Sequence, residues 1–313
     1  MGTGDDMEKK YALLIDADNV SAKYIKPILD ELSKYGKITT KRIYGDWTST
    51  QQGTWKDELL QNSIIPIQQF AYTQGKNATD SALIIDAMDI LYTNALDGFC
   101  IVSSDSDFTR LASRIRENGL TVVGMGENKT PQPFRKACDV FTTLELLIAE
   151  NDNETREDKI HTEEAAIIPK TQLEEKVAEI IDQNLNDDKA TGLGEVGSRL
   201  VKLYPDFDVR SYGYKLLSKF LDDFEKFSVI REGNDLFVKL NRDLSVEEEV
   251  ENYVRQLVEE QKETGIVLGS LGQKLHAKYP TFSVRDLGYS QFNRYIRNLK
   301  GLKVEEDVVK AVE

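Results

Sequence analysis

The stretch Phe99–Phe108, FCIVSSDSDF, joins a short apolar run to a polar turn that carries two carboxylates. The apolar residues at its start are typical of a strand that is buried on both faces. Leu111, Ala112 and Ile115 follow at helical spacing, so the polar turn lies between a strand and a helix. In an open α/β sheet, ligands bind beyond the carboxyl ends of the strands. The turn is therefore a candidate site.

The N-terminal half of the chain alternates apolar runs with helical segments. Strands are predicted at 11–15, 38–44, 64–70, 99–102, 120–125 and 140–142, and helices at 21–32, 55–60, 80–92 and 108–117. Pro66 interrupts the third strand, which indicates an edge position in the sheet. This alternation predicts an α/β domain with a parallel sheet and helices on both faces.

The chain changes character after this domain and then repeats itself. In residues 149–170 the character changes: Asn151–Asp158 is charged and almost free of apolar side chains, which is typical of a linker. Beyond them, Tyr204-Pro205 recurs as Tyr279-Pro280, 75 residues further on. Two copies of so long a period indicate tandem small domains, each with helices followed by a hairpin, as in a winged helix-turn-helix. We expect domains at 1–148, 171–242 and 243–313.

Composition narrows the classes of function. The net charge of −14 argues against a protein that coats nucleic acid through bulk positive charge. With only two Cys and two His, a zinc site or a His-activated nucleophile is not expected. No apolar run approaches the roughly 18 residues of a membrane span. No secretory signal is visible either, so the expected location is cytoplasmic.

Further acids follow the predicted strands. Asp16 and Asp46 each come after a strand, and Asp80 opens the helix 80–92. Because parallel strands end at one edge of a sheet, these acids can converge on Asp105. Two unit charges 4 Å apart repel by about 4 kcal/mol at an effective dielectric near 20, so such a group needs a proton or a cation. Mg²⁺ or Mn²⁺ suits oxygen ligands.

Capping is the competing interpretation for aspartates at such positions. It is nearly as strong as metal ligation for Asp107 and Asp18, and a role in the turn competes for Asp46. Asp86 and Asp89 lie further along the helix and are expected on its solvated face. The acids favoured as the site are the three that coincide on one predicted edge: Asp16, Asp80 and Asp105.

These motifs resemble those of the NYN family, a branch of the PIN-like nucleases. The resemblance rests on Asp16-x-x-Asn19, Thr79-Asp80 and Ser103-x-Asp105-Ser106-Asp107-Phe108. The two C-terminal copies resemble OST-HTH domains, also called LOTUS domains, which occur joined to NYN domains. The resemblance implies a PIN-like fold and a ribonuclease that depends on Mg²⁺ or Mn²⁺. It implies that Asp16, Asp80 and Asp105 are catalytic residues that bind the metal and that Asp107 is a further metal ligand. The supporting residues that it implies are Asn19, Asp46 and Ser103.

Local basic regions offset the acidic total. The net charge is +6 over Gly272–Lys303 and +3 over Arg199–Leu221. Phosphate contacts of this kind give affinity without reading sequence. We expect the tandem copies to hold RNA, and the LOTUS resemblance implies structured or G-rich RNA. The residues expected to contact RNA are Lys76, Arg210, Lys215, Arg285, Tyr289 and Arg294.

Three functions compete on these grounds. The first is a metal-dependent ribonuclease. The second is a non-catalytic module that binds RNA while its LOTUS-like domains recruit a partner protein such as a helicase. The third is a phosphatase or phosphotransfer domain, and the lack of an Asp-x-Asp-x-Thr/Val motif counts against it, since Asp16–Val20 is only a partial match.

Overall fold

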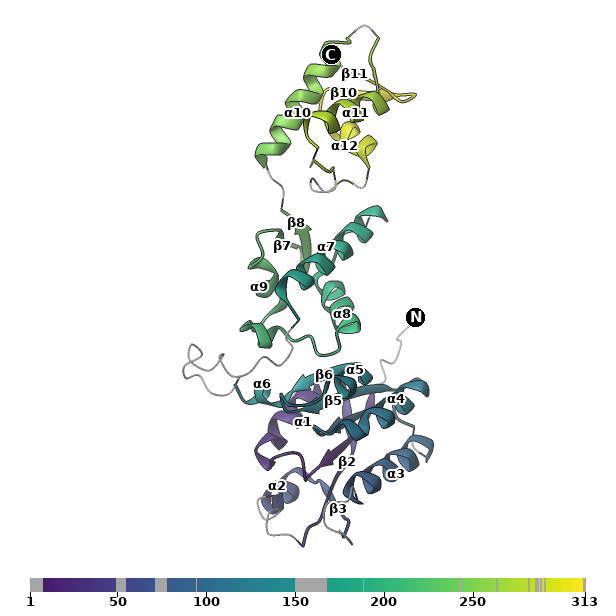
Figure 1. The fold of residues 1–313 in the computed structure, drawn as a ribbon, viewed down its shortest axis with the longest axis vertical. Helices are drawn as coiled ribbons and strands as arrows, with labels where there is room; N and C mark the ends of the chain where they lie inside the picture. The colour runs from purple at the N-terminus through teal and green to yellow at the C-terminus, as the bar shows by residue number, and fades with distance from the viewer. Residues whose placement is uncertain are drawn as a thin grey trace. The chain divides into compact units, whose positions relative to one another are not determined.

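A six-stranded parallel sheet forms the centre of the N-terminal part (Figure 1). The computed structural model describes residues 8–48, 55–70, 78–93, 95–149, 168–187, 189–241, 244–262, 264–280, 282–284, 287, 289 and 291–311. The strands are Lys10–Asp16 (β1), Lys37–Gly45 (β2), Ile65–Gln68 (β3), Gly98–Val102 (β4), Thr121–Gly126 (β5) and Val140–Thr143 (β6). The predicted parallel sheet is confirmed, and β3, which contains Pro66, lies at its edge.

Helices cover both faces of this sheet, as the sequence predicts. One core holds apolar side chains of α1 (Ile25–Ser33), α2 (Trp55–Asn62) and α6 (Leu144–Ala149). The core on the other face holds those of α3 (Ala78–Thr93), α4 (Thr109–Glu117) and α5 (Gln132–Ala137). The helices α5 and α6 were not predicted, because six residues give too few turns for a helical period to stand out.

The order of the strands creates a switch point at the centre of the sheet. The order is β3-β2-β1-β4-β5-β6, so the chain builds outward from β1 and then returns to the other side of β1 as β4. Ile15 of β1 pairs with Val102 of β4. In sheets of this kind the crevice between two such strands, at their carboxyl ends, is where ligands bind. The residues after Ile15 and Val102 therefore occupy the favoured position for a site.

Each C-terminal copy has helices followed by a hairpin, as predicted. The first contains α7 (Lys170–Asn186), α8 (Leu193–Leu203), α9 (Leu217–Asp222) and the hairpin of β7 (Phe227–Glu232) with β8 (Asp235–Leu240). Gly233 has a φ of +65° in the hairpin turn, a conformation that favours glycine. The second contains α10 (Leu244–Glu259), α11 (Leu268–Lys278) and α12 (Phe292–Asn298). Its three strands are Ile266–Val267 (β9), Leu302–Glu305 (β10) and Val308–Ala311 (β11).

The chain divides into two compact units. One comprises Met1–Ile167 with Val201–Ser211, and the other Ile168–Leu200 with Tyr212–Glu313. Most of the predicted linker, 149–170, lies outside the described residues. In the part of the chain that is described, no helix is long and apolar enough to cross a membrane.

Candidate functional site

Asp16 is the innermost acid at the switch point. It is the last residue of β1 and is fully buried. Its carboxylate accepts hydrogen bonds from the Asn19 side-chain amide at 2.7 Å, the Ser103 hydroxyl at 2.7 Å and the Asp18 backbone amide at 3.0 Å. Burial raises the pKa of Asp16, and these donors oppose part of that rise. The structure thus places Asn19 and Ser103 directly against Asp16.

Ser103 joins the end of β4 to the turn that follows it. Its hydroxyl donates to Asp16 and accepts from the backbone amide of Asp105 at 3.0 Å. The last residue of β5, Gly126, packs against it: a Cβ on this glycine would come within 2.5 Å of the Ser103 carbonyl oxygen. The polar turn is therefore held from both neighbouring strands.

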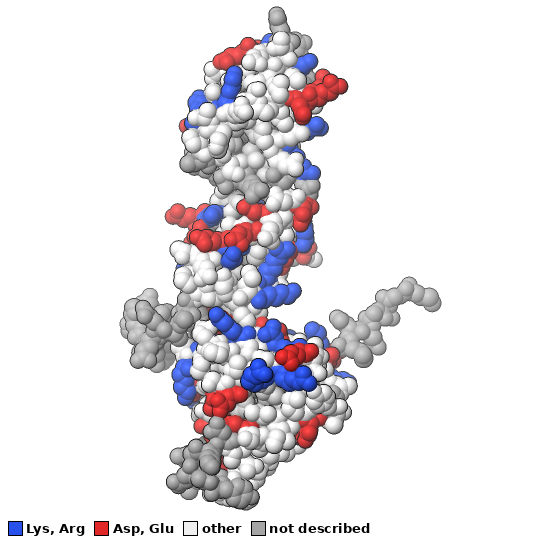
Figure 2. Space-filling model, turned by 45° about the vertical axis from the view of Figure 1, so that its right-hand side comes forward, with Lys and Arg blue, Asp and Glu red and all other residues white. Residues whose placement is uncertain are grey.

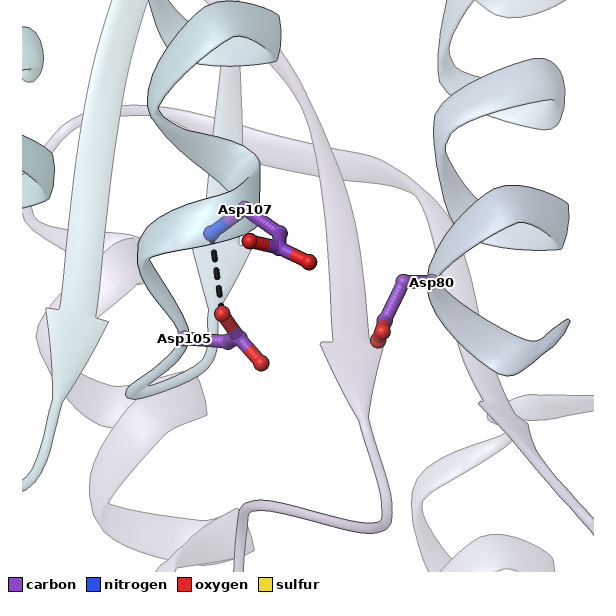
Figure 3. A group of neighbouring side chains, drawn as sticks. All are labelled: Asp80, Asp105 and Asp107. Carbon is purple, nitrogen blue, oxygen red and sulfur yellow. Dashed lines mark hydrogen bonds between the residues drawn. The ribbon is translucent and has the colours of Figure 1, made fainter. Parts of the chain in front are cut away.

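Asp105 and Asp107 are carried by that turn. Asp105 precedes a short 3-10 helix, η3 (Ser106–Phe108), and its side chain accepts from the Asp107 amide at 2.9 Å (Figure 3). Asp80 comes from the first turn of α3, which faces the turn, and all three carboxylates point toward one space between them. Phe108 is fully buried beneath η3 and anchors it in the core.

Among the described residues, Asp80, Asp105 and Asp107 form a group able to hold a metal ion. Each offers a carboxylate oxygen, and these oxygens lie within 4.8 Å of one another. We call these three side chains the carboxylate group. Asp107, for which capping competed in the sequence, is part of it. Asp16 lies close behind, near enough to influence Asp80, but its oxygens are already engaged by donors.

The pKa of Asp80 reflects the crowding of acids around it. Burial, followed by the neighbouring charges of Asp16, Asp105 and Asp107, raises the pKa of Asp80 to about 6. Like charges at such distances repel by several kcal/mol, which a divalent cation would reverse. The donors are all oxygens, which is the set that Mg²⁺ and Mn²⁺ prefer. The residues present therefore fit a divalent cation.

Asp46 lies at the same edge but is engaged elsewhere. Directly after β2, its Oδ1 accepts from the Thr48 amide at 3.1 Å, the Thr48 hydroxyl at 2.6 Å and the Gln68 side-chain amide at 2.9 Å. These contacts close the turn after β2 and tie it to the end of β3. The described contacts of Asp46 therefore match the turn role that competed for it in the sequence.

The prediction of a solvated Asp86 is wrong. Its carboxylate contacts Arg42 and Tyr44 of β2, and only 22% of the side chain is exposed. Asp89, by contrast, is exposed as expected. The spacing holds a signal that could have corrected this, because Asp86 lies three residues after the buried Leu83 and four before the buried Ile90.

The residues predicted to contact RNA have different surroundings. Lys76 and Arg285 lie outside the described residues. Lys215 and Arg294 are exposed. Tyr289 is half-buried, with its ring 5.4 Å from that of Tyr295, so much of it packs on the core of the second copy.

Arg210 is engaged by carboxylates. Its guanidinium contacts Asp208 at 2.6 Å and Glu31 at 3.1 Å, all three residues belonging to one compact unit. Only 14% of the Arg210 side chain is exposed. A phosphate would have to displace one of these carboxylates to reach it.

Arg110 is a further cation, three residues after Asp107, that the sequence pattern did not single out. It is exposed in the first turn of α4, and its side chain makes no ion pair or hydrogen bond with any described residue. A helix start disfavours a cation, so the local structure does not account for Arg110. Its position next to an acidic turn was the available signal. On the face drawn in Figure 2, Lys and Arg are interspersed with Asp and Glu.

Comparison with models of protein families agrees with this architecture. The model of the NYN domain matches residues 10–145, and that of the OST-HTH/LOTUS domain matches 169–238 and 246–311. No curated protein matches the chain. Among solved structures, a protein of unknown function from Vibrio parahaemolyticus is similar at 19% identity, over 44% of this chain and 94% of that chain, with a TM-score of 0.39.

Proposed function

The chain contains an NYN domain, followed by two OST-HTH/LOTUS domains, and from this premise we propose that it is a metal-dependent ribonuclease. NYN and PIN-like nucleases generally use divalent metals, and OST-HTH/LOTUS domains bind RNA. The observation that carries the proposal is the convergence of Asp80, Asp105 and Asp107 at the switch point of the sheet.

In this proposal the carboxylate group holds Mg²⁺ or Mn²⁺. A bound divalent ion of this type polarises a phosphodiester and lowers the pKa of a water molecule that attacks it. Asp16 supports the group from behind. Through Ser103 it fixes the backbone of the turn that carries Asp105 and Asp107. Asn19 holds the Asp16 carboxylate in the orientation that accepts the Ser103 hydroxyl.

RNA binding in this proposal combines two sources. The OST-HTH/LOTUS domains supply exposed cations such as Lys215 and Arg294, which favour phosphates without reading sequence. Arg110, three residues after Asp107, supplies one more cation that can contact a phosphate of the bound RNA. Structured or G-rich RNA is the substrate class that the LOTUS resemblance favours.

One observation favours the alternative, a non-catalytic RNA-binding module that recruits a protein partner. The second OST-HTH/LOTUS domain has an apolar groove of about 410 Å³, lined by residues of α11 and by Phe282, Val284 and Phe292. Apolar grooves of this kind accept the apolar face of a partner helix. A helicase is the class of partner that the LOTUS resemblance implies.

Cleavage of labelled RNA separates the two functions. Single-stranded and structured RNA are incubated with Mg²⁺ or Mn²⁺ and the wild type, Asp105→Asn or Asp89→Asn. The last variant is a matched control, since Asp89 is an exposed acid on α3 outside the carboxylate group. If the protein is a ribonuclease, the wild type and Asp89→Asn cleave the RNA and Asp105→Asn does not. If all three proteins bind RNA but none cleaves it with Mg²⁺ or with Mn²⁺, the protein is not a ribonuclease, and the RNA-binding module remains.

A further inference from the structure

Asp86 of α3 bridges two side chains of β2. One carboxylate oxygen accepts from the Arg42 guanidinium and the other from the Tyr44 hydroxyl. Tyr44 is fully buried, and the exposed fractions of the Arg42 and Asp86 side chains are 30% and 22%. Burial, and next to it the hydrogen bond to Asp86, raise the pKa of Tyr44, so its hydroxyl stays a donor. A charged, partly buried acceptor with two donors is a directional contact.

The same tyrosine is tied to the strand that carries Asp16. In the parallel pairing of β1 with β2, Asp16 lies opposite Tyr44, and the Ala17 amide donates to the Tyr44 carbonyl oxygen at 2.9 Å. The backbone of Tyr44 thus holds the end of β1, while its side chain holds α3. This residue connects the strand end of Asp16 to the helix of Asp80.

The carboxylate group depends on the placement of α3. Asp105 and Asp107 share one turn, whereas Asp80 reaches them from a separate helix (Figure 3). The buried stripe of α3 packs through apolar contacts, which are non-directional and tolerate sliding. A shift by one residue moves a helix by 1.5 Å along its axis and turns it by about 100°, whereas a metal site tolerates roughly 0.5 Å.

We propose that Asp86 is a positioning residue: its bridge to Arg42 and Tyr44 fixes α3 along β2 so that Asp80 meets Asp105 and Asp107. The bridge lies six residues beyond Asp80 on the same helix and contacts none of the three. It holds Asp80 against the repulsion of the other carboxylates. The inference rests on the proposed function for the identity of the ion, but the placement of Asp80 by the bridge can be tested without any metal.

Mn²⁺ uptake, read from the free-Mn²⁺ electron paramagnetic resonance signal, gives the first test. The variants are Asp86→Asn and Tyr44→Phe, with Asp139→Asn as a control. Asp139 forms a comparable pair with Arg116 at 2.9 Å, outside the carboxylate group. Losing the bridge should weaken Mn²⁺ binding by about tenfold or more, as loss of a group that orients metal ligands does. Asp139→Asn should lower Tm by about as much as Asp86→Asn does but should bind Mn²⁺ with wild-type affinity. Wild-type Mn²⁺ affinity in folded Asp86→Asn overturns the inference.

A double-mutant cycle without metal gives the second test and does not depend on the proposed function. Tm is measured for wild type, Asp86→Asn, Asp80→Asn and the double variant. If the bridge holds Asp80 against repulsion, Asp86→Asn lets α3 move and relieves that repulsion when Asp80 is present. In the Asp80→Asn background there is no repulsion to relieve. Asp86→Asn should therefore lower Tm more in the Asp80→Asn background, whereas a bridge that only stabilises the fold gives equal losses. Equal losses of Tm in the two backgrounds overturn the inference. If the wild type takes up no Mn²⁺, the metal site is refuted, and the cycle alone decides the role of Asp86.

Discussion

The Ser103 hydroxyl donates to Oδ2 of Asp16 at 2.7 Å, although 87 residues separate them in the chain. Both residues are fully buried, and the same hydroxyl accepts from the Asp105 amide. One small side chain therefore joins the ends of β1 and β4 and sets the turn that presents two of the three acids.

Replacing Ser103 with Ala should destabilise the protein by about 1–3 kcal/mol, because a buried carboxylate loses a donor. Thermal or denaturant unfolding of the metal-free protein measures this loss. Ser106→Ala is the control, since the exposed Ser106 uses only its backbone carbonyl in the contacts of η3. It should change stability by no more than about 0.5 kcal/mol. Equal effects of the two variants would contradict the role given to Ser103.

The raised pKa of Asp80 predicts a pH dependence of metal-free stability. A carboxyl with a pKa of about 6 in the folded state, against its ordinary 3.8, binds more protons when folded. Its stabilising contribution is therefore present below about pH 4 and is lost as the pH rises through about 6. Asp80→Asn removes this loss, so above pH 6 the variant should be the more stable by roughly 1 kcal/mol, after allowance for solvent screening.

Denaturant unfolding of the wild type and Asp80→Asn across this pH window checks the sign. The stability difference between the two should grow in favour of the variant as the pH rises from about 4 to about 6. Asp89→Asn, which removes an exposed carboxylate of the same helix outside the carboxylate group, is the matched control. A difference that stays constant over the window would contradict the raised pKa of Asp80.

Arg110, three residues after Asp107, is expected to contact RNA. Arg110→Glu should weaken RNA affinity of the full chain and lower the slope of its salt dependence by about 1, the change for one lost phosphate contact. Filter binding or fluorescence anisotropy at several salt concentrations measures both. Lys26→Glu, an exposed cation in the first turn of α1, is the matched control. If Lys26→Glu has the same effect, the loss reflects overall charge and not contact.

The basic regions of the C-terminal copies are expected to supply most of the affinity. Lys215→Glu combined with Arg294→Glu should weaken binding of single-stranded and structured RNA more than Arg110→Glu does. The salt slope should fall by about 2. Cleavage under saturating RNA should change little, since neither residue belongs to the carboxylate group. Unchanged affinity in the double variant would remove these two residues from the RNA surface.

Much of this arrangement follows from local pattern. The apolar runs that end at Asp16 and before Ser103 mark buried parallel strands, whose ends meet at one edge. Asp80 is predictable because an acid is favoured at the start of an amphipathic helix. These inferences need only periodicity and strand direction, which the sequence records residue by residue.

The rest depends on side chains that meet across the fold. Asp46 and Asp107 both follow strand ends, yet Asp107 reaches the space facing α3 while Asp46 bonds to Gln68, 22 residues away. Asp86 lies on the flank of the buried stripe, and only the position of β2 shows that Arg42 and Tyr44 are there to meet it. The sequence pattern predicts which edge of the sheet carries the acids, but rotamers and cross-strand partners decide which of these acids converge.

The central claim is that Asp80, Asp105 and Asp107 together hold a divalent cation. Its most direct test is a Mn²⁺ titration near neutral pH, followed by electron paramagnetic resonance, of wild type, Asp105→Asn and Asp89→Asn. The account predicts that wild type and Asp89→Asn take up Mn²⁺ equally and that Asp105→Asn binds it at least about tenfold more weakly. Equal uptake by wild type and a folded Asp105→Asn, or no uptake by the wild type, would contradict it.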